Sequence, residues 1–110
     1  MTDPDKLARI FKVLSVTTRV RIVELLRDRS LCVNALARML DMTPAAVSQH
    51  LRILRDADIV TAQKQGYFVH YRINEATLTE WNMMTRSLLE SREGELSSPP
   101  PANEAADPAT

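Results

Sequence analysis

The side chains best suited to chemistry in this sequence lie on one predicted helix, between Thr43 and Ala57. Apolar residues at helical spacing predict its buried face: Val47, Leu51 and Leu54. The opposite face carries Ala45, Ser48, Gln49 and Arg52. Glutamine can bind adenine through two hydrogen bonds, arginine can bind guanine, and an alanine methyl can contact the thymine methyl. The pattern therefore indicates a helix that reads bases in the major groove of DNA.

The start of this helix is a predicted phosphate site. Thr43 is suited to cap the helix, and Pro44 suits its first position. The small residues Pro44, Ala45 and Ala46 let this end approach DNA closely, where free backbone N–H groups and the Thr43 hydroxyl can bind a phosphate. His50 is interpreted as a further phosphate contact. The alternative is that His50 holds together the two consecutive helices that precede the predicted hairpin.

A β-hairpin is predicted after this helix, because two β-rich runs flank a glycine. Its strands are expected over residues 59–63 and 67–73. A cationic, glycine-containing tip suits contact with phosphates or with the adjacent minor groove. The residues expected to contact DNA are Lys64, Gln65, Gly66 and Tyr67. Phe68 and Val69 stay ambiguous between core and surface.

The remaining elements are predicted from capping signals and apolar spacing. Asp3 and Asn74 are expected to cap the first and last helices, Thr17 or Thr18 the second, and Asn34 a brief helix that carries Leu36, Met39 and Leu40. The other expected boundaries are helices over 4–16, up to 27 and over 75–92, and a short strand over 30–33. Two consecutive helices followed by a hairpin are typical of a winged helix-turn-helix. The expected fold is therefore mainly α, with a β-hairpin wing.

The formal net charge of zero is a sum of two opposite parts. Between Lys6 and Arg86 there are 13 basic and 7 acidic residues, a net charge of +6. Residues 97–110 hold four of the six prolines and no large apolar side chain, so they cannot bury enough surface to offset their ordering entropy. We expect a DNA-binding and dimerisation domain over 1–96 and a disordered, Pro-rich acidic tail over 97–110.

Several function classes are not expected from the composition. No apolar run approaches the roughly 20 residues of a membrane span, no signal peptide opens the chain, and a single cysteine, Cys32, suits a reducing cytoplasm. The chain has only two histidines, and no Gly-rich phosphate loop, nucleophile elbow or paired carboxylates. We expect no enzymatic activity, no cofactor and no metal site.

These motifs resemble the ArsR/SmtB family of bacterial winged-helix repressors. The similarity covers about residues 14–73 and is carried by the opening Leu14–Ile22, the recognition-helix pattern Val47–Leu51 and the wing Gly66–Ile73. It implies a homodimer, joined through the first and last helices, that blocks a promoter until an inducer binds; two-fold symmetry implies an inverted-repeat operator. The interface residues expected on those helices are Leu7, Ile10, Phe11, Leu78, Trp81, Met84 and Leu88.

The chain departs from the family pattern where metal-sensing members bind their inducer. Such members often carry Cys-Val-Cys where this chain has Cys32-Val33-Asn34, and others place histidine ligands on the last helix, which here has none. Asp58 stands where the family commonly has a helix-ending glycine. We therefore expect an unidentified inducer other than a metal ion. The alternatives are a metal- or thiol-responsive sensor that uses Cys32, and a winged-helix module that binds another protein.

Overall fold

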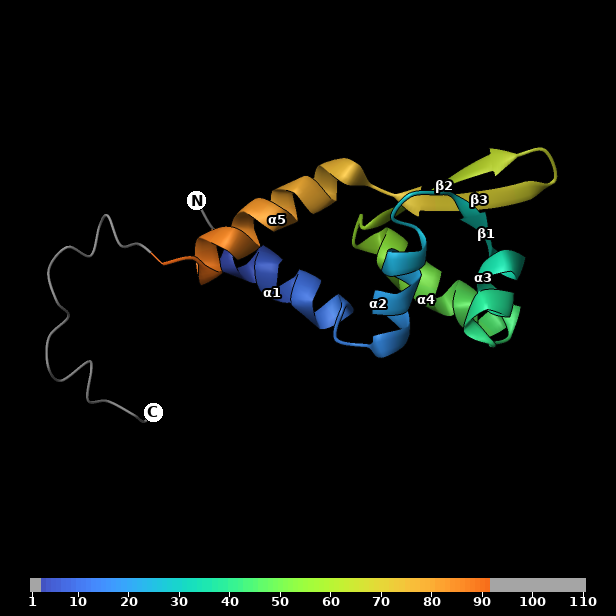
Figure 1. Ribbon diagram of the computed structural model, residues 1–110, viewed down its shortest axis with the longest axis horizontal. Coiled ribbons are helices and arrows are strands. Elements are labelled where there is room, and N and C mark those ends of the chain that lie inside the picture. The colour runs from blue at the N-terminus through green and yellow to red at the C-terminus, as the bar shows by residue number, and fades with distance from the viewer. Residues whose placement is uncertain (1–2, 92–110) are drawn as a thin grey trace, which may run out of the picture.

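The computed structural model describes residues 3–91, so the predicted tail over 97–110 and the predicted end of the last helix near Arg92 lie outside it. Its elements (Figure 1) are, in chain order, α1 (Pro4–Val13), α2 (Thr17–Leu25), β1 (Leu31–Cys32), α3 (Val33–Leu40), α4 (Pro44–Asp56), β2 (Val60–Gln65), β3 (Phe68–Ile73) and α5 (Glu75–Leu89). This order confirms the predicted fold class. None of the described helices is long and apolar enough to cross a membrane.

The three strands form one antiparallel sheet in the order β1-β3-β2. The short strand β1 joins the edge of β3, with Leu31 opposite Tyr71 and Cys32 opposite His70. This pairing confirms the predicted strand over 30–33. Figure 1 shows the hairpin of β2 and β3 projecting past the N-terminal end of α4.

The hairpin turn begins two residues later than predicted and is one residue shorter. Gln65 pairs with Phe68, so Gly66 and Tyr67 form a two-residue turn, and Lys64 lies within β2 instead of in the turn. Gly66 has a φ of +67°. Glycine with positive φ at the first position of a two-residue turn suits type II′, whose twist matches that of the flanking strands.

The main core lies between the sheet and helices α2, α3 and α4. Its most completely buried members are Ile22, Leu26, Leu36, Val47, Leu51, Leu54, Ile59 and Val60. Burying one such side chain fully stabilises the fold by about 1.5–3 kcal/mol, so this cluster holds α4 firmly. The predicted inward face of α4 is confirmed, whereas Met39, predicted on the apolar face of α3, is 43% exposed.

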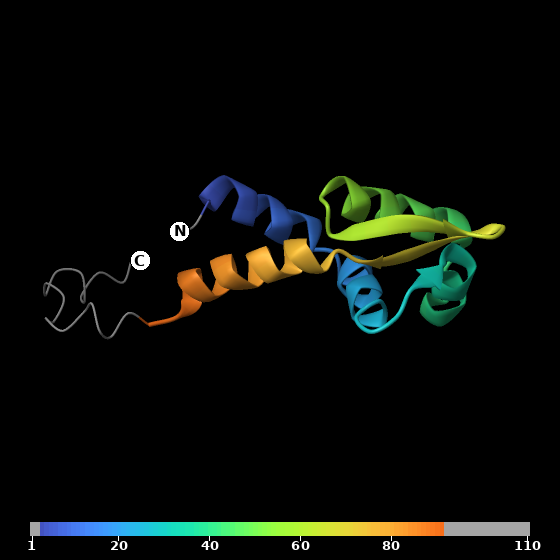
Figure 2. The same cartoon turned by 90° about the horizontal axis from the view of Figure 1, so that it is seen from above.

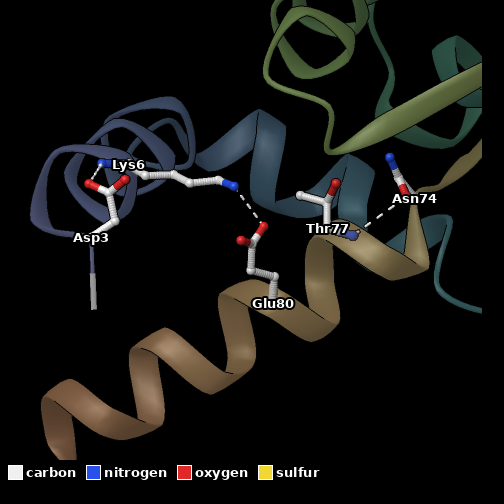
Figure 3. A network of polar contacts seen from close by, with 5 residues as sticks. All are labelled: Asp3, Lys6, Asn74, Thr77 and Glu80. Carbon is white, nitrogen blue, oxygen red and sulfur yellow. Dashed lines mark hydrogen bonds and ion pairs between the residues drawn. The ribbon is translucent and has the colours of Figure 1, made fainter. Parts of the chain in front are cut away.

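Helices α1 and α5 lie side by side and extend away from this core (Figures 1 and 2). A separate buried cluster joins them, and its members are Leu7, Ile10 and Met84. The rings of Phe11 and Trp81 meet edge to face, with centroids 6.0 Å apart. Lys6 Nζ and Glu80 Oε1 form an exposed ion pair 2.7 Å long (Figure 3). Because exposed pairs contribute only about 0–1 kcal/mol, apolar contact holds the two helices together.

Side-chain caps begin both helices of this pair, as predicted (Figure 3). Asp3 Oδ1 accepts a hydrogen bond from the Lys6 N–H at 3.2 Å. Asn74 Oδ1 accepts one from the Thr77 N–H at 3.5 Å. In each case a carboxylate or amide oxygen satisfies one of the donors that a helix start leaves without an intrahelical partner.

Two other predicted caps are wrong. Thr17 and Thr18 are the first two residues of α2 and do not cap it. The N-cap of α2 is Val16, which makes no side-chain hydrogen bond. Asn34 lies inside α3, whose N-cap is Cys32. The physical reason is that β1 pairs with β3 as far as Cys32 and α3 begins at the next residue. Sheet pairing, and not a capping side chain, therefore sets this helix start.

The first two helices also end earlier than predicted, at Val13 and Leu25 instead of about 16 and 27. After α1, the Ser15 N–H and hydroxyl both donate to the Lys12 carbonyl, at 3.3 and 2.7 Å. Val16 is then extended, with φ −108° and ψ 122°. The chain must turn here because α1 packs on α5 while α2 packs on the main core.

Helix α4 ends in a left-handed residue, Asp58, with a φ of 60°. The Asp58 N–H donates to the Arg55 carbonyl and the Ile59 N–H to the Leu54 carbonyl, both at 2.9 Å. This is the hydrogen-bond pattern of a Schellman motif, where glycine is favoured because it has no Cβ.

Replacing Asp58 with glycine is expected to raise the free energy of unfolding by roughly 0.5–1 kcal/mol, because it relieves the left-handed backbone. Asp58→Ala is the matched control, which keeps a Cβ and is expected to be less stable than the wild type. Urea unfolding of the three proteins measures the difference. A glycine variant no more stable than the alanine variant would show that this helix end is unstrained.

Candidate nucleic-acid interface

The burial of one side of α4 leaves its other side open. The predicted base-reading residues are all exposed: Ala45, Ser48, Gln49 and Arg52. They share one side because successive helix residues are rotated by about 100°. The helix therefore presents a hydroxyl, an amide and a guanidinium on a backbone that its buried face holds in place.

The N-terminus of α4 is built as predicted. The Ala46 N–H donates to Thr43 Oγ1 at 3.1 Å, and Thr43 and Pro44 are both exposed. Pro44 has no N–H and the Ala46 N–H is taken by the cap, so the Ala45 N–H is a donor at this helix start that a phosphate could accept from. The Thr43 hydroxyl accepts in the capping bond and can still donate its own proton.

The hairpin tip offers polar and apolar contacts together. Its predicted DNA-contacting residues are all exposed: Lys64, Gln65, Gly66 and Tyr67, the last of these to 99%. Phe68 and Val69, which the sequence left ambiguous, are 54% and 41% exposed. About half of each side chain is accessible, and apolar surface therefore lies beside the cationic end of the wing.

His50 lies in a different environment from the other predicted site residues. It is half-buried, and its Nδ1 accepts a hydrogen bond from Nε of Arg19, in α2, at 3.2 Å. This contact joins α4 to α2 and not to the preceding helix α3. A lock within the predicted helix pair and a phosphate contact therefore both stay predictions. Sequence reasoning missed Arg19, because its partner is 31 positions away in the chain.

Burial and the Arg19 contact together determine the charge of His50, and the contact determines its tautomer. Burial and, to a smaller extent, the positive charge of Arg19 hold the pKa of His50 below its ordinary value of 6.5. The ring is therefore neutral at pH 7. Because Nδ1 accepts from Arg19, the ring proton lies on Nε2.

Part of the predicted dimer interface is already buried within one chain. The accessible fractions of Leu7, Ile10 and Met84 are only 4%, 5% and 6%. Their burial comes from the packing of α1 on α5, so a second copy is not needed to cover them. The sequence showed that these residues are apolar at helical spacing, and this spacing does not tell which neighbour covers them.

Other apolar side chains on this pair stay open. Phe11 and Leu88 are 40% and 55% exposed, and Leu78 and Trp81 are half-buried. Met83 and Leu89, on the same helix as Leu88, are 67% and 73% exposed. Exposed apolar surface on α1 and α5 is therefore available to a partner.

Cys32 is a half-buried free thiol. It lies in β1, opposite His70 in β3. The two residues belong to separate elements, as predicted, and strand pairing brings them together. No group of three or more His, Cys, Asp and Glu side chains within residues 3–91 could hold a metal ion.

Comparison with known proteins identifies similar chains. The family model for the bacterial regulatory protein, arsR family, matches residues 17–62. The chain is 32% identical over 92 residues to the cadmium resistance transcriptional regulatory protein CadC homolog of Staphylococcus aureus, a match that covers 83% of this chain and 74% of that protein. It is 40% identical over 67 residues to the arsenical resistance operon repressor of Escherichia coli, of which it spans 57%.

A similar solved structure is the homodimeric winged helix-turn-helix DNA-binding domain of a possible ArsR-family transcriptional regulator from Mycobacterium bovis. The two are 28% identical, with a TM-score of 0.64. The match covers 78% of this chain and 83% of that one. The winged helix-turn-helix fold expected from the sequence is thereby confirmed.

The free energy of unfolding is expected to fall as the pH decreases below 6.5, the ordinary pKa of histidine. In the folded state the pKa of His50 is lower, so between the two values the unfolded chain binds more protons. The contribution of His50 is complete above 6.5 and is lost as the pH falls through the folded-state pKa. Urea unfolding between about pH 7.5 and pH 5.5 measures it.

His50→Asn is the control for this pH dependence, because asparagine does not titrate and keeps an acceptor near the position of Nδ1. The variant retains His70, so the pH dependence of its free energy of unfolding should lose only the part that His50 contributes. An unchanged pH dependence in His50→Asn would contradict the assignment.

Proposed function

Because this chain belongs to the ArsR family of bacterial transcriptional regulators, we propose that it is a homodimeric repressor that binds an inverted-repeat operator. Membership of this family makes the chain a regulator and not an enzyme. The observation that carries the proposal is the exposed polar face of α4, opposite a face that is completely buried. A helix of this kind beside an exposed hairpin fits one major groove and its flanking backbone.

Two protomers would place two such helices on one side of the duplex. The homodimeric Mycobacterium bovis neighbour supports this arrangement, and so does the exposed apolar surface of α1 and α5, at Phe11, Met83, Leu88 and Leu89. Two-fold symmetry then selects an inverted repeat, with half-site centres separated by one helical turn of about 34 Å or a multiple of it. Leu7, Ile10 and Met84 would support this interface from within each chain instead of meeting the partner.

The proposed contacts divide into two kinds. Gln49 and Arg52 read bases, because an amide and a guanidinium can each make two hydrogen bonds with a base edge. Thr43, Ser48 and Lys64 bind the phosphate backbone and position the helix. The small side chains of Pro44 and Ala45 let the helix end approach the DNA closely. The wing tip contacts the adjacent DNA backbone through Gln65, Gly66 and Tyr67.

We further propose that the repressor is released in the cytoplasm by a signal other than a metal ion. The relatives from Staphylococcus aureus and Escherichia coli are named for cadmium and arsenical resistance. In this chain Asn34 stands where a second thiolate would be needed beside Cys32, and the described part of α5 has no histidine. A zinc-type site requires three or four ligands, and a thiol signal at Cys32 is the alternative.

Gln49→Ala is expected to weaken binding by roughly 1–3 kcal/mol at an operator with the matching base and to change binding to other sequences little. Affinities for the operator and for single-base variants of it, at one salt concentration, measure this effect. Gln63→Ala removes another exposed glutamine, from β2, and is the matched control. Equal losses of affinity on all sequences would show that Gln49 does not read a base.

Lys64→Ala is expected to weaken binding to every sequence alike and to reduce the salt dependence, log K against log salt concentration, by about one unit. Titrations at several salt concentrations measure that slope. Lys12→Ala, which removes an exposed lysine from α1, should leave the slope unchanged. A loss confined to one operator sequence would show that Lys64 does not act on the phosphates.

A further inference from the structure

The guanidinium of Arg19 connects three helices. Its Nε donates to His50 Nδ1 in α4 at 3.2 Å, and its Nη1 donates to the carbonyl of Val13, the last residue of α1, at 3.1 Å. Arg19 itself belongs to the first turn of α2. The end of the α1–α5 pair and the middle of the proposed DNA-reading helix are therefore held by one side chain.

Both bonds suit arginine in particular. The Val13 carbonyl lies at the C-terminal end of α1, where the last carbonyls lack intrahelical partners and a positive charge is favourable. The guanidinium is planar and carries its donors in a fixed fork. Two acceptors bound to that fork are held at a set distance from each other, so the position of α4 relative to α1 is restricted.

The His50 side chain points away from the exposed polar face of α4, as a residue that fixes the helix to its neighbour should. At about 100° per residue, His50 lies roughly 150° around the helix from the mean direction of Ala45, Ser48, Gln49 and Arg52. It is half-buried, whereas those four residues are exposed. His50 therefore faces α2 and not the side of the helix that would enter the groove.

We propose that Arg19 and His50 act as a pair of positioning residues, which fix the rotation of α4 and so aim Gln49 and Arg52 at the bases. The inference rests on the proposed function of α4 as the DNA-reading helix, and it assigns His50 to holding that helix instead of binding a phosphate. Because Arg19 also binds the Val13 carbonyl, these two residues connect α4 to the α1–α5 pair, on which the proposed dimer depends.

The first test uses the free protein and needs no DNA. The ¹⁵N NMR shifts of His50 are expected to show an unprotonated Nδ1 in the wild type. In Arg19→Met, Nδ1 loses its donor, and the pKa of His50 should rise because one cause of its lowering is removed. Arg21→Met removes an exposed arginine from the same helix and should change neither property. Unchanged His50 shifts in Arg19→Met would overturn the contact itself.

The second test is a double-mutant cycle on operator affinity. Arg19→Met and His50→Ala are each expected to weaken operator binding about tenfold. The double variant should also lose about tenfold instead of about a hundredfold, because either change alone breaks the same link. Effects that multiply would mean that His50 acts independently of Arg19, as a phosphate contact would.

Two conservative variants separate positioning from general damage to the fold. His50→Asn keeps an acceptor near the position of Nδ1 and should retain most of the operator affinity. His50→Gln places its amide nearer to the position of Nε2 and should behave like His50→Ala. The opposite order would favour a contact made through Nε2 and overturn the proposal. If the wild-type chain binds no operator while its NMR signature is as expected, the proposed function fails and the Arg19–His50 contact stands.

Discussion

Val47, Leu51 and Leu54 have no accessible surface on one side of α4, and this burial determines which side of the helix can meet a partner. Each buried leucine contributes about 1.5–3 kcal/mol. A rotation of α4 that hid Gln49 and Arg52 would expose these apolar groups and bury a guanidinium without a partner, which is costly on both counts. The polar face is thus directed outward by the core beneath it. Arg19 adds a finer restraint, because it ties the same helix to the end of α1.

The distribution of charge explains why positioning matters for this chain. Its net charge is zero, and the excess of +6 between Lys6 and Arg86 is balanced by acidic residues at the two ends. Bulk attraction to DNA is therefore modest, and non-specific binding depends mainly on such attraction. Affinity must come from a few directed contacts, which the proposed symmetric dimer would make twice. A small error in the direction of α4 would misplace those contacts in both half-sites.

Local signals in the sequence predicted the elements that local chemistry determines. The capping residues Asp3 and Thr43 and the spacing of the α4 core residues each depend on neighbours within a few positions. The start of α3 could not be predicted in this way, because Leu31 pairs with Tyr71 far along the chain. The same holds for the Arg19–His50 bond and for Ile10 and Met84, which cover each other across α1 and α5. Sequence reasoning therefore predicted the composition of the candidate site and missed the contacts that orient it.

Hydroxyl-radical footprinting of the 110-residue chain on its own upstream DNA tests the central claim most directly. A dimer that places one α4 in each of two major grooves should protect two symmetric half-sites on one side of the duplex. Their centres should lie one helical turn of about 34 Å, or a whole multiple of it, apart. Protection of a single half-site, or uniform protection without an inverted repeat, would contradict the account.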